Sequence, residues 1–431
     1  SPLNLNRPMN ANSHAATTVI TGLGVITSIG QGKADFAEAL FAGKTAFGYL
    51  QRAGRESSNV SPFIGAEISE PARLSPEHTR LLRTASLSAK LSLIVALEAW
   101  QDAQLDSASV DPMRIGLVVG GSNIQQRVQW QTWQRHAENP TFLTPSYGLT
   151  VWDSDLVGVL SQALGIQGEG FVIGNGTASG AAAIIHAARQ VQMGITDVSL
   201  ALGTLCDLSH WECQGLKSMG AMGSDHFADC PQLAYRPFDR DADGFIFGEG
   251  CGVVVIENAE HARRRAIQPY AGLRGWASTL SANRGAQTSK EGQIRAISMA
   301  LQMAGLPAAA IDYVNPHGSG SPQGDQIELE ALRATGLAHC WLNATKSLTG
   351  HCFTAAGTVE AIATLLQMKV GRLHPTHNLI NPIDGELRWV QQEAIDATLR
   401  YAISNSFALG GVSTTLVFSN DDTELVTVQP A

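Results

Sequence analysis

Four short segments of the chain contain residues whose types and spacing could support chemistry. The first is the glycine-rich run at residues 174–180 (GNGTASG), which separates a predicted strand from a predicted alanine-rich helix. The run places Thr177 at the start of that helix, where backbone N–H groups and the helix dipole suit an anion or a developing oxyanion. The alternative is ordinary strand–turn–helix packing, with Thr177 or Ser179 capping the helix.

The second segment is PHGSGSP at residues 316–322, just beyond a predicted short strand. A loop this rich in glycine and serine does not suit a hydrophobic core. We therefore expect His317 to lie exposed in a cleft, where an imidazole can donate or accept a hydrogen bond. The alternative is an ordinary loop histidine without a chemical role.

The third segment is KSLTGH at residues 346–351, which precedes an Ala/Gly-rich helix. Lys346 and His351 are five residues apart and can converge on one pocket. His351 would then act as a hydrogen-bond donor, and Lys346 would orient or tune it. The alternative is a solvated lysine and a packed histidine.

The fourth segment is NSFALGG at residues 405–411, which includes Phe407 and Leu409. We predict a turn here, and its backbone N–H groups could complete an oxyanion hole.

No metal site is expected. His374 and His377 have the spacing of metal ligands, but no acidic or cysteine partner stands beside them. The six cysteines are scattered without a CxxC pair, which is typical of reduced, mostly buried thiols in a cytosolic protein.

The elements that must position these segments alternate between strand-length apolar runs and stretches with helical periodicity. Strands are predicted over residues 18–26, 115–119, 170–173, 197–202, 244–257, 270–279, 313–315, 343–346 and 416–418. Helices are predicted over residues 33–41, 86–103, 151–164, 178–193, 293–304, 326–333 and 355–369, and residues 125–142 fit a surface insertion. The pattern indicates two similar α/β halves that pack as one body.

Composition excludes several classes of protein. Of the 431 residues, 44% are hydrophobic and 16% are charged, which does not suit an intrinsically disordered chain. The formal net charge of −9, without an extended basic run, argues against nucleic-acid binding. No uncharged apolar stretch approaches the roughly 20 residues of a membrane helix, and residues 1–16 are expected to form a disordered leader or the remnant of an expression tag.

Taken together, the motifs resemble the β-ketoacyl synthase (ketosynthase) branch of the thiolase fold. The resemblance spans residues 17–418 and rests on TVITGLGVITSIGQG, RPFDRDADGFIFGEGCGVVVIE, PHGSGSPQGD, KSLTGHCFTAAGTVEAIA and NSFALGG. It implies an α/β, five-layered αβαβα fold from two similar halves, residues 17–264 and 265–431. It also implies a homodimer that acts on acyl groups carried by an acyl carrier protein.

Two departures from the ketosynthase pattern are informative. Thr177 stands where such enzymes have a nucleophilic cysteine, and Leu409 stands where they usually have a gating phenylalanine. A thiol at a helix N-terminus ionises readily, whereas a hydroxyl needs a dedicated base. Acyl transfer to the enzyme, and condensation with it, are therefore expected to be lost.

The resemblance assigns roles to the retained residues. His317 and His351 match the two active-site histidines that stabilise the enolate formed when carbon dioxide leaves malonyl-carrier, and Lys346 matches the family lysine. Thr177 is expected to line the pocket by a hydroxyl hydrogen bond, and its backbone N–H with that of Leu409 to line an oxyanion hole. The remaining substrate-binding residues are expected to be Phe407, Ser319 and Ser321.

A closer resemblance is carried by FGYLQRAGR, FIGAEI, GVLSQALGIQGEGFVIG and KSMGAMG. These segments are similar to the decarboxylating ketosynthase-like proteins of polyketide β-branching cassettes, which usually carry serine at the position of Thr177. The implied activity is decarboxylation of malonyl-[acyl carrier protein] to acetyl-[acyl carrier protein] in the cytoplasm. The implied partners are the malonyl-loaded carrier and a downstream hydroxymethylglutaryl-synthase-like enzyme. No cofactor is expected, because the phosphopantetheine arm belongs to the carrier.

Two alternatives stay open at the level of the sequence. The chain could be a non-catalytic partner subunit resembling a chain-length factor, which also lacks the cysteine but has no chemical need for both histidines and the lysine. Thr177 could also act as a slow nucleophile, which would form an acyl-enzyme.

Overall fold

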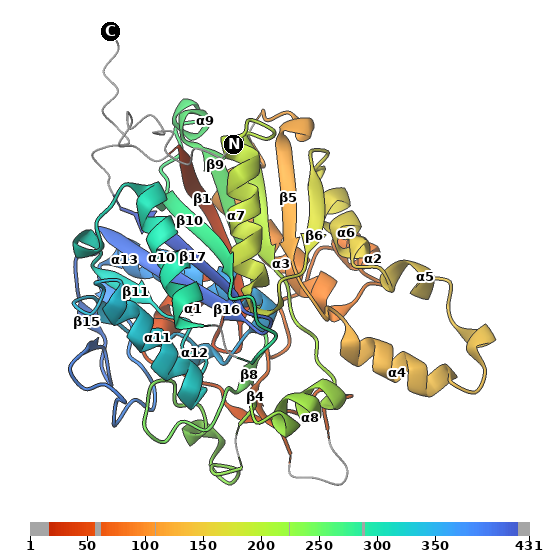
Figure 1. Cartoon of the computed structure of the whole chain (residues 1–431). Coiled ribbons are helices and arrows are strands. Elements are labelled where there is room, and N and C mark those ends of the chain that lie inside the picture. The colour runs from red at the N-terminus through yellow and green to blue at the C-terminus, as the bar shows by residue number, and fades with distance from the viewer. Residues whose placement is uncertain (1–16, 57–61, 108, 224, 287–288, 421–431) are drawn as a thin grey trace, which may run out of the picture.

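The computed structural model describes residues 17–56, 62–107, 109–223, 225–286 and 289–420. A long mixed sheet runs through the molecule (Figure 1), in the order β14-β12-β11-β16-β17-β10-β1-β9-β7-β5-β6. The strands of the N-terminal part are β1 (Thr18–Thr27), β5 (Ile115–Gly120), β6 (Gly170–Ile173), β7 (Val198–Gly203) and β9 (Gly250–Asn258). The strands of the C-terminal part are β10 (Ala271–Leu280), β11 (Tyr313–Asn315), β12 (Trp341–Leu342), β14 (Arg388–Trp389), β16 (Tyr401–Ala408) and β17 (Val412–Ser419).

The strand order repeats on either side of the β1–β10 pair. Outward from β1, strand β9 and then β7 pair antiparallel, and β5 and then β6 pair parallel. Outward from β10, strand β17 and then β16 pair antiparallel, and β11 and then β12 pair parallel. The same topology twice is the arrangement expected of two similar α/β halves.

Helices form three layers around the two parts of the sheet. The central pair is α7 (Ser179–Gln192) and α13 (Ala356–Val370), which pack on each other and share one buried apolar cluster with strands of both parts. One outer layer is α3 (Leu87–Asp102) with α6 (Ser154–Leu164), and the other is α10 (Lys290–Ala304) with α11 (Pro322–Ala334). This is the five-layered αβαβα fold that the motifs predict.

Small residues permit the close contact between the two central helices. A Cβ added to Gly357 of α13 would lie 2.3 Å from the backbone nitrogen of Ala181 in α7. A Cβ added to Gly180 would lie 2.9 Å from the backbone nitrogen of Thr358. Because α7 and α13 each begin next to a predicted site segment, their contact brings the two segments together.

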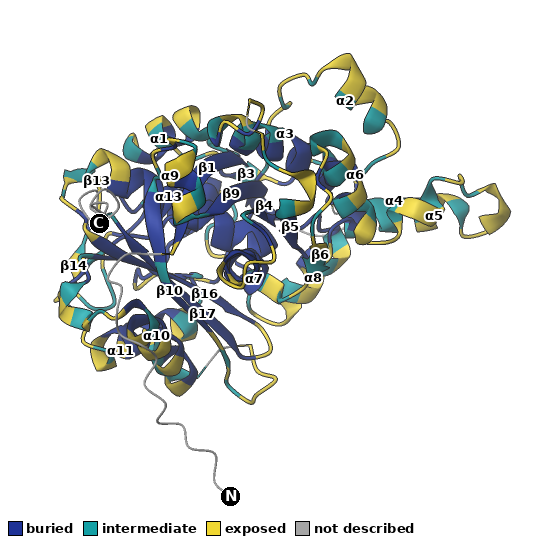
Figure 2. Cartoon of the chain, turned by 90° about the horizontal axis from the view of Figure 1, so that it is seen from above, coloured by how far each residue is buried: buried dark blue, intermediate teal, exposed yellow. Residues whose placement is uncertain are grey.

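The remaining helices and strands lie around this core. They are β2 (Gly30–Gln31), α1 (Lys33–Phe41), β3 (Gly48–Tyr49), β4 (Ile64–Ala66), α2 (Pro76–Leu81), α4 (Gln126–His136), α5 (Tyr147–Thr150), α8 (His210–Ser218), β8 (Phe247–Gly248), α9 (Ala259–Arg264), α12 (Lys346–Thr349), β13 (Arg372–Leu373) and β15 (Ile395–Asp396). Helices α4 and α5 form an arm that projects from the body of the molecule (Figure 2), where the sequence predicts a surface insertion.

Three predicted elements differ from the structure. The run at 244–257 is broken at Glu249 into β8 and β9, because the Glu249 carboxylate turns to a cluster of arginines. The strand predicted at 343–346 ends at Leu342, and Lys346 instead begins α12. The turn predicted at 405–411 is shorter, since residues 405–408 pair with β17 as part of β16.

The structure also places the cysteines and His374. All six cysteines are free, and only Cys230 among them is exposed. His374 is a buried core histidine whose ring contacts the Thr345 hydroxyl and the Pro375 carbonyl. No described helix combines the length and the apolarity needed to cross a bilayer. The expectation for residues 1–16 falls outside the described part of the chain.

Candidate active site

One pocket between the two halves collects most of the predicted site residues. Seven of them line it, namely Thr177, His317, Ser319, Ser321, His351, Phe407 and Leu409. They come from the start of α7, the loop after β11, the loop before α13 and the β16–β17 turn. The eighth residue, Lys346, is 1% exposed and lies behind the pocket wall.

The His317 ring is held so that its inner nitrogen accepts hydrogen bonds. The backbone N–H of Phe407 donates to Nδ1 at 3.2 Å, and Lys346 Nζ lies 3.4 Å from the same atom. An imidazole that accepts at Nδ1 carries its proton on Nε2. Burial, and then the charge of Lys346, holds the pKa of His317 well below its ordinary value of 6.5. His317 is therefore a neutral donor through Nε2.

His351 has the same arrangement on the other side of the pocket. The backbone N–H of Phe353 donates to its Nδ1 at 3.1 Å, which again leaves the proton on Nε2. Burial, followed by the charge of Lys346, keeps the pKa of His351 well below 6.5. The rings of His351 and His317 have centroids 5.3 Å apart, so both histidines can donate to one small acceptor.

Aromatic rings enclose His351. Phe353 stacks on the imidazole with a centroid distance of 4.8 Å and an interplanar angle of 26°. Phe245 approaches edge-on at 5.6 Å, and both phenylalanines line the pocket. Because these rings exclude water, a hydrogen bond to charge that develops in the pocket is stronger than in solvent. The backbone of Phe353 has φ of +51°, in the left-handed region that is rare for this residue type.

Lys346 contacts a different histidine from the one expected. Its Nζ donates to the His317 carbonyl at 2.6 Å and to Glu360 Oε1 at 2.7 Å. The expectation is that Lys346 orients or tunes His351. Lys346 begins α12 and reaches back to the loop after β11, so the histidine that it contacts is His317. Its influence on His351 is electrostatic, through the lowered pKa.

Three buried carboxyl groups at the pocket are missing from the sequence predictions: Asp325 and Glu328 belong to its lining, and Glu360 lies behind it. Glu328 accepts the backbone N–H groups of His317 and Gly318 at 2.8 Å each, and Asp325 accepts that of Gly320 at 3.2 Å. Burial raises the pKa of Asp325, Glu328 and Glu360 to about 7. Two features of the sequence could have pointed to these groups. Asp325 and Glu328 are spaced i, i+3 on the helix after the PHGSGS loop, and Glu360 is the one acidic residue of the Ala-rich α13.

The Thr177 hydroxyl is already engaged. Thr177 lies in a single helical turn, Gly176–Ala178, immediately before α7, as the GNGTASG run predicts. Its Oγ1 donates a short hydrogen bond to the Phe407 carbonyl. Among the described residues, no titratable side chain accepts a hydrogen bond from this hydroxyl, so none is placed to act as its base.

Leu409 and the two serines lie toward the pocket mouth. Leu409 is exposed in the β16–β17 turn, which closes through Gly410 and Gly411, both with positive φ. Ser321 caps α11 by accepting the N–H of Gly324, and the Ser319 carbonyl accepts the Tyr235 hydroxyl at 2.7 Å. The loop with both serines is thus anchored at its two ends.

Family models match most of the chain. The model for the β-ketoacyl synthase N-terminal domain matches residues 16–262, and the model for the β-ketoacyl synthase C-terminal domain matches residues 270–380. The chain belongs to the β-ketoacyl synthase family.

Relatives of known sequence and structure cover nearly the whole ketosynthase-like chain. It is 49% identical over 405 residues to the polyketide biosynthesis malonyl-ACP decarboxylase PksF of Bacillus subtilis (strain 168), covering 93% of this chain and 96% of the relative. It is 29% identical to the 3-oxoacyl-[acyl-carrier-protein] synthase 2 of Coxiella burnetii, and the match covers 93% of this chain and 98% of that relative. The crystal structure of a β-ketoacyl synthase from Burkholderia phymatum STM815 superposes with a TM-score of 0.82 at 27% identity. The match covers 94% of this chain and 99% of that structure.

Proposed function

We propose that this chain decarboxylates malonyl-[acyl carrier protein] to acetyl-[acyl carrier protein] without an acyl-enzyme, for β-branching in polyketide biosynthesis. The observation that carries the proposal is the pair of neutral Nε2–H donors, His317 and His351, in a pocket whose Thr177 hydroxyl is engaged by a backbone carbonyl. The identity of 49% to a relative named as a malonyl-ACP decarboxylase supports the same activity.

The reaction breaks the bond between the malonyl carboxylate carbon and the methylene carbon. The electron pair of that bond forms the carbon–carbon double bond of a thioester enolate, and carbon dioxide leaves. The thioester oxygen takes the negative charge, and the Nε2–H groups of His317 and His351 donate to it. A proton then adds to the methylene carbon, which gives the acetyl thioester. The net consumption is one proton for each carbon dioxide released.

The electrostatics of the pocket stabilise the negative charge of the enolate oxygen. Hydrogen-bond donors that are already oriented stabilise an oxyanion without reorganisation. The backbone amides of Phe407 and Phe353 fix the two rings, so neither histidine must turn during the reaction. Lys346, held by Glu360 and the His317 carbonyl, adds a positive charge behind the first of the two donors.

Thr177 acts as a wall of the pocket in this proposal. Its hydroxyl hydrogen is committed to the Phe407 carbonyl, and a hydroxyl without a base does not attack a thioester at a useful rate. The hydrogen bond ties the start of α7 to the end of β16, beside the backbone amide that orients His317.

The partners follow from the reaction. The substrate is a carrier-bound thioester, so the phosphopantetheine arm must enter past Ser319, Ser321 and Leu409 at the mouth. A hydroxymethylglutaryl-synthase-like enzyme would consume the acetyl product.

The arm formed by α4 and α5 supports a homodimer. It exposes four large apolar residues, and each of these is about two thirds exposed, which is unusual for a monomer (Trp133, Phe142, Leu149 and Trp152). Strand β6 ends the sheet in the described part of the chain and leaves an edge beside the base of the arm (Figure 1). A second copy that covers both features would bury them together.

Intact-mass spectrometry of malonyl-loaded carrier protein, incubated with this protein, tests the function. Conversion to acetyl-carrier with unmodified enzyme is the expected result. An acyl adduct on the enzyme would favour Thr177 as a nucleophile. Persistence of malonyl-carrier with a cognate carrier, together with capture of a stoichiometric ketosynthase subunit, would favour the chain-length-factor alternative and refute the proposal.

A further inference from the structure

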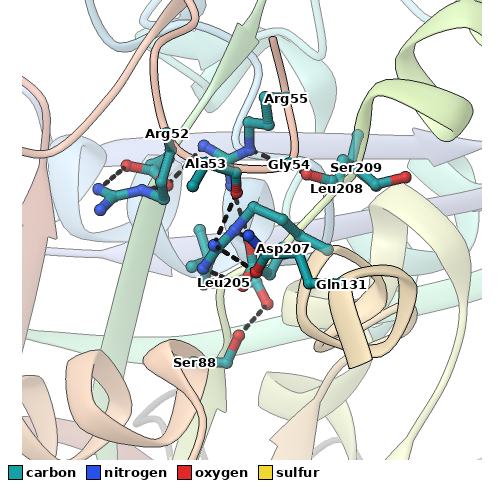
Figure 3. Close-up of polar contacts among 12 residues, drawn as sticks. Arg52, Ala53, Gly54, Arg55, Ser88, Gln131, Leu205, Asp207, Leu208 and Ser209 are labelled. Carbon is teal, nitrogen blue, oxygen red and sulfur yellow. Dashed lines mark hydrogen bonds and ion pairs between the residues drawn. The ribbon is translucent and has the colours of Figure 1, made fainter. Parts of the chain in front are cut away.

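A second buried polar cluster lies outside the pocket, on the far side of its aromatic wall. Figure 3 shows Arg52 and Arg55 from the loop after β3 above Asp207, which follows β7. Arg55 is 0% exposed, and its guanidinium binds Asp207 at 2.8 Å and Glu249 at 2.7 Å. The proposed reaction uses none of these groups.

Glu249 is the carboxylate that links this cluster to the sheet. It is fully buried between β8 and β9 and binds Arg52 at 2.6 Å. It also accepts the backbone N–H of Ile68 at 2.8 Å, and its own N–H donates to the Ala66 carbonyl at 2.8 Å. Glu249 therefore holds one end of β8 through both its side chain and its backbone.

Strand β8 is in turn hydrogen-bonded to His351. The His351 N–H donates to the Ile246 carbonyl at 2.8 Å, and the Gly248 N–H donates to the His351 carbonyl at 2.9 Å. These two bonds flank Phe247, and Glu249 follows Gly248 directly. The contact is close, because a Cβ at Gly248 would lie 2.2 Å from the Thr349 carbonyl oxygen.

Side chains form a parallel connection. The Arg55 guanidinium lies 5.0 Å from the centroid of the Phe247 ring. The Phe247 ring packs against Phe353 at 5.5 Å, and Phe353 stacks on His351 at 4.8 Å. A displacement of Arg55 or Glu249 would thus reach the imidazole along the backbone of β8 and along this row of rings.

We propose that the cluster of Arg52, Arg55 and Glu249 positions His351 for the decarboxylation assigned above, by fixing β8 in register behind it. The inference rests on the proposed function for its kinetic test. A buried ion pair contributes little net stability compared with apolar packing, but the loss of one partner leaves a charge that forces rearrangement. Such a cluster specifies one geometry of the strand, and His351 is bonded to that strand.

Glu249→Gln tests the proposal, with Glu257→Gln as the matched control. Glu257 is also fully buried and lies near the far end of β9, bound by Arg265 at 2.9 Å and His261 at 2.8 Å. We expect Glu249→Gln to lower kcat by about 10- to 100-fold with little change in KM, because a small misplacement of a catalytic group has effects of this size. We expect Glu257→Gln to keep the wild-type kcat after a comparable loss of thermal stability.

A second readout does not depend on activity. In protein labelled with ¹⁵N-histidine, the imidazole spectrum of His351 at neutral pH should show the Nε2–H tautomer, assigned by its absence in His351→Gln. Glu249→Gln should shift or broaden that signal, and Glu257→Gln should leave it unchanged. If Glu249→Gln does not fold, Phe247→Leu removes the connecting ring without changing charge, and the same two measurements apply to it.

The outcomes separate the two proposals. Wild-type protein that fails to decarboxylate malonyl-carrier refutes the proposed function, and the spectrum of His351 then decides the positioning role by itself. Active wild-type protein, with Glu249→Gln equal to Glu257→Gln in kcat and in the His351 signal, overturns the positioning role.

Discussion

The imidazole rings of His317 and His351 lie with their centroids 5.3 Å apart and their planes at 78°. Each ring accepts a backbone N–H at Nδ1, from Phe407 and from Phe353 respectively, so each directs an Nε2–H outward. Two donors from different segments thus converge where a thioester oxygen can be bound. This relationship gives the site its chemistry in the absence of a thiol.

Loss of either donor should reduce catalysis. We expect His317→Ala or His351→Ala to lower kcat for malonyl-carrier decarboxylation by ~10²–10³, the usual effect of removing one oxyanion donor. His339→Ala is a suitable control, because the His339 ring contacts the Ile311 carbonyl at 2.9 Å outside the pocket. Acetyl-carrier production that survives His317→Ala would contradict the assigned mechanism.

The Thr177 hydroxyl should be dispensable for the reaction. Thr177→Val keeps the shape of the side chain and removes only the hydrogen bond to the Phe407 carbonyl, which we expect to destabilise the fold by about 1 kcal/mol. Decarboxylation should continue at a rate within about an order of magnitude of wild type, since ~1.4 kcal/mol corresponds to tenfold. Unfolding in urea and single-turnover kinetics measure the two effects, with Thr177→Ser as the variant that keeps the hydroxyl. Complete loss of activity in Thr177→Val alone would indicate a nucleophile.

The pH dependence should reflect neutral histidines. Since burial and the charge of Lys346 hold the pKa of both histidines well below 6.5, the fall in kcat caused by protonation of the rings should have its midpoint well below pH 6.5. Protonation of Asp325, Glu328 and Glu360, whose pKa is about 7, would give a separate change near neutral pH. The titratable groups that contact His317 are Lys346 and His351 at its ring and Glu328 at its backbone N–H.

Removing the positive charge of Lys346 should raise the pH at which kcat falls on the acid side of the pH profile, here called the acid limb. In the double variant Lys346→Met with Glu360→Gln, no buried charge of the pair is left unpaired. The pKa of His317 and of His351 should rise without the positive charge, so activity should begin to fall at a higher pH than in wild type. Glu360→Gln alone keeps the lysine and should not move the limb in that direction. An acid limb at the same pH in the double variant would show that Lys346 does not tune the pair.

The apolar arm should control the oligomeric state. Trp133→Glu combined with Phe142→Glu introduces charge on two side chains that are 68% and 71% exposed. If a second copy covers them, light scattering should give the mass of two chains for wild type and of one chain for the variant. Met299→Glu, on an exposed position of α10, is the control that should leave the mass unchanged. A wild-type protein that is already monomeric would contradict the proposed dimer.

Much of the fold could be predicted because burial leaves a periodic pattern. Helix α1 matches the predicted bounds, and β1, β5 and β6 match to within a residue, since their apolar runs are bounded by glycine or polar residues. Strand β16 was missed because its polar residues, such as Ser404 and Asn405, are buried rather than solvent-exposed. A hydrophobicity pattern does not reveal a strand whose polar side chains are buried inside the protein.

By itself, the sequence determined which groups are available for chemistry: two histidines and a lysine beside strands, and a threonine in place of a thiol. Residue type sets these properties, because ionisation and hydrogen-bonding capacity belong to the side chain. Only the tertiary structure decided that Lys346 contacts His317, that three buried carboxyl groups surround this histidine and its lysine, and that Glu249 is linked to His351 through β8. Lys346 and the carboxyl groups reach His317 within the C-terminal half, through the packing of α11, α12 and α13. Glu249 and His351 come from different halves, and their distance follows from how these halves pack around α7 and α13.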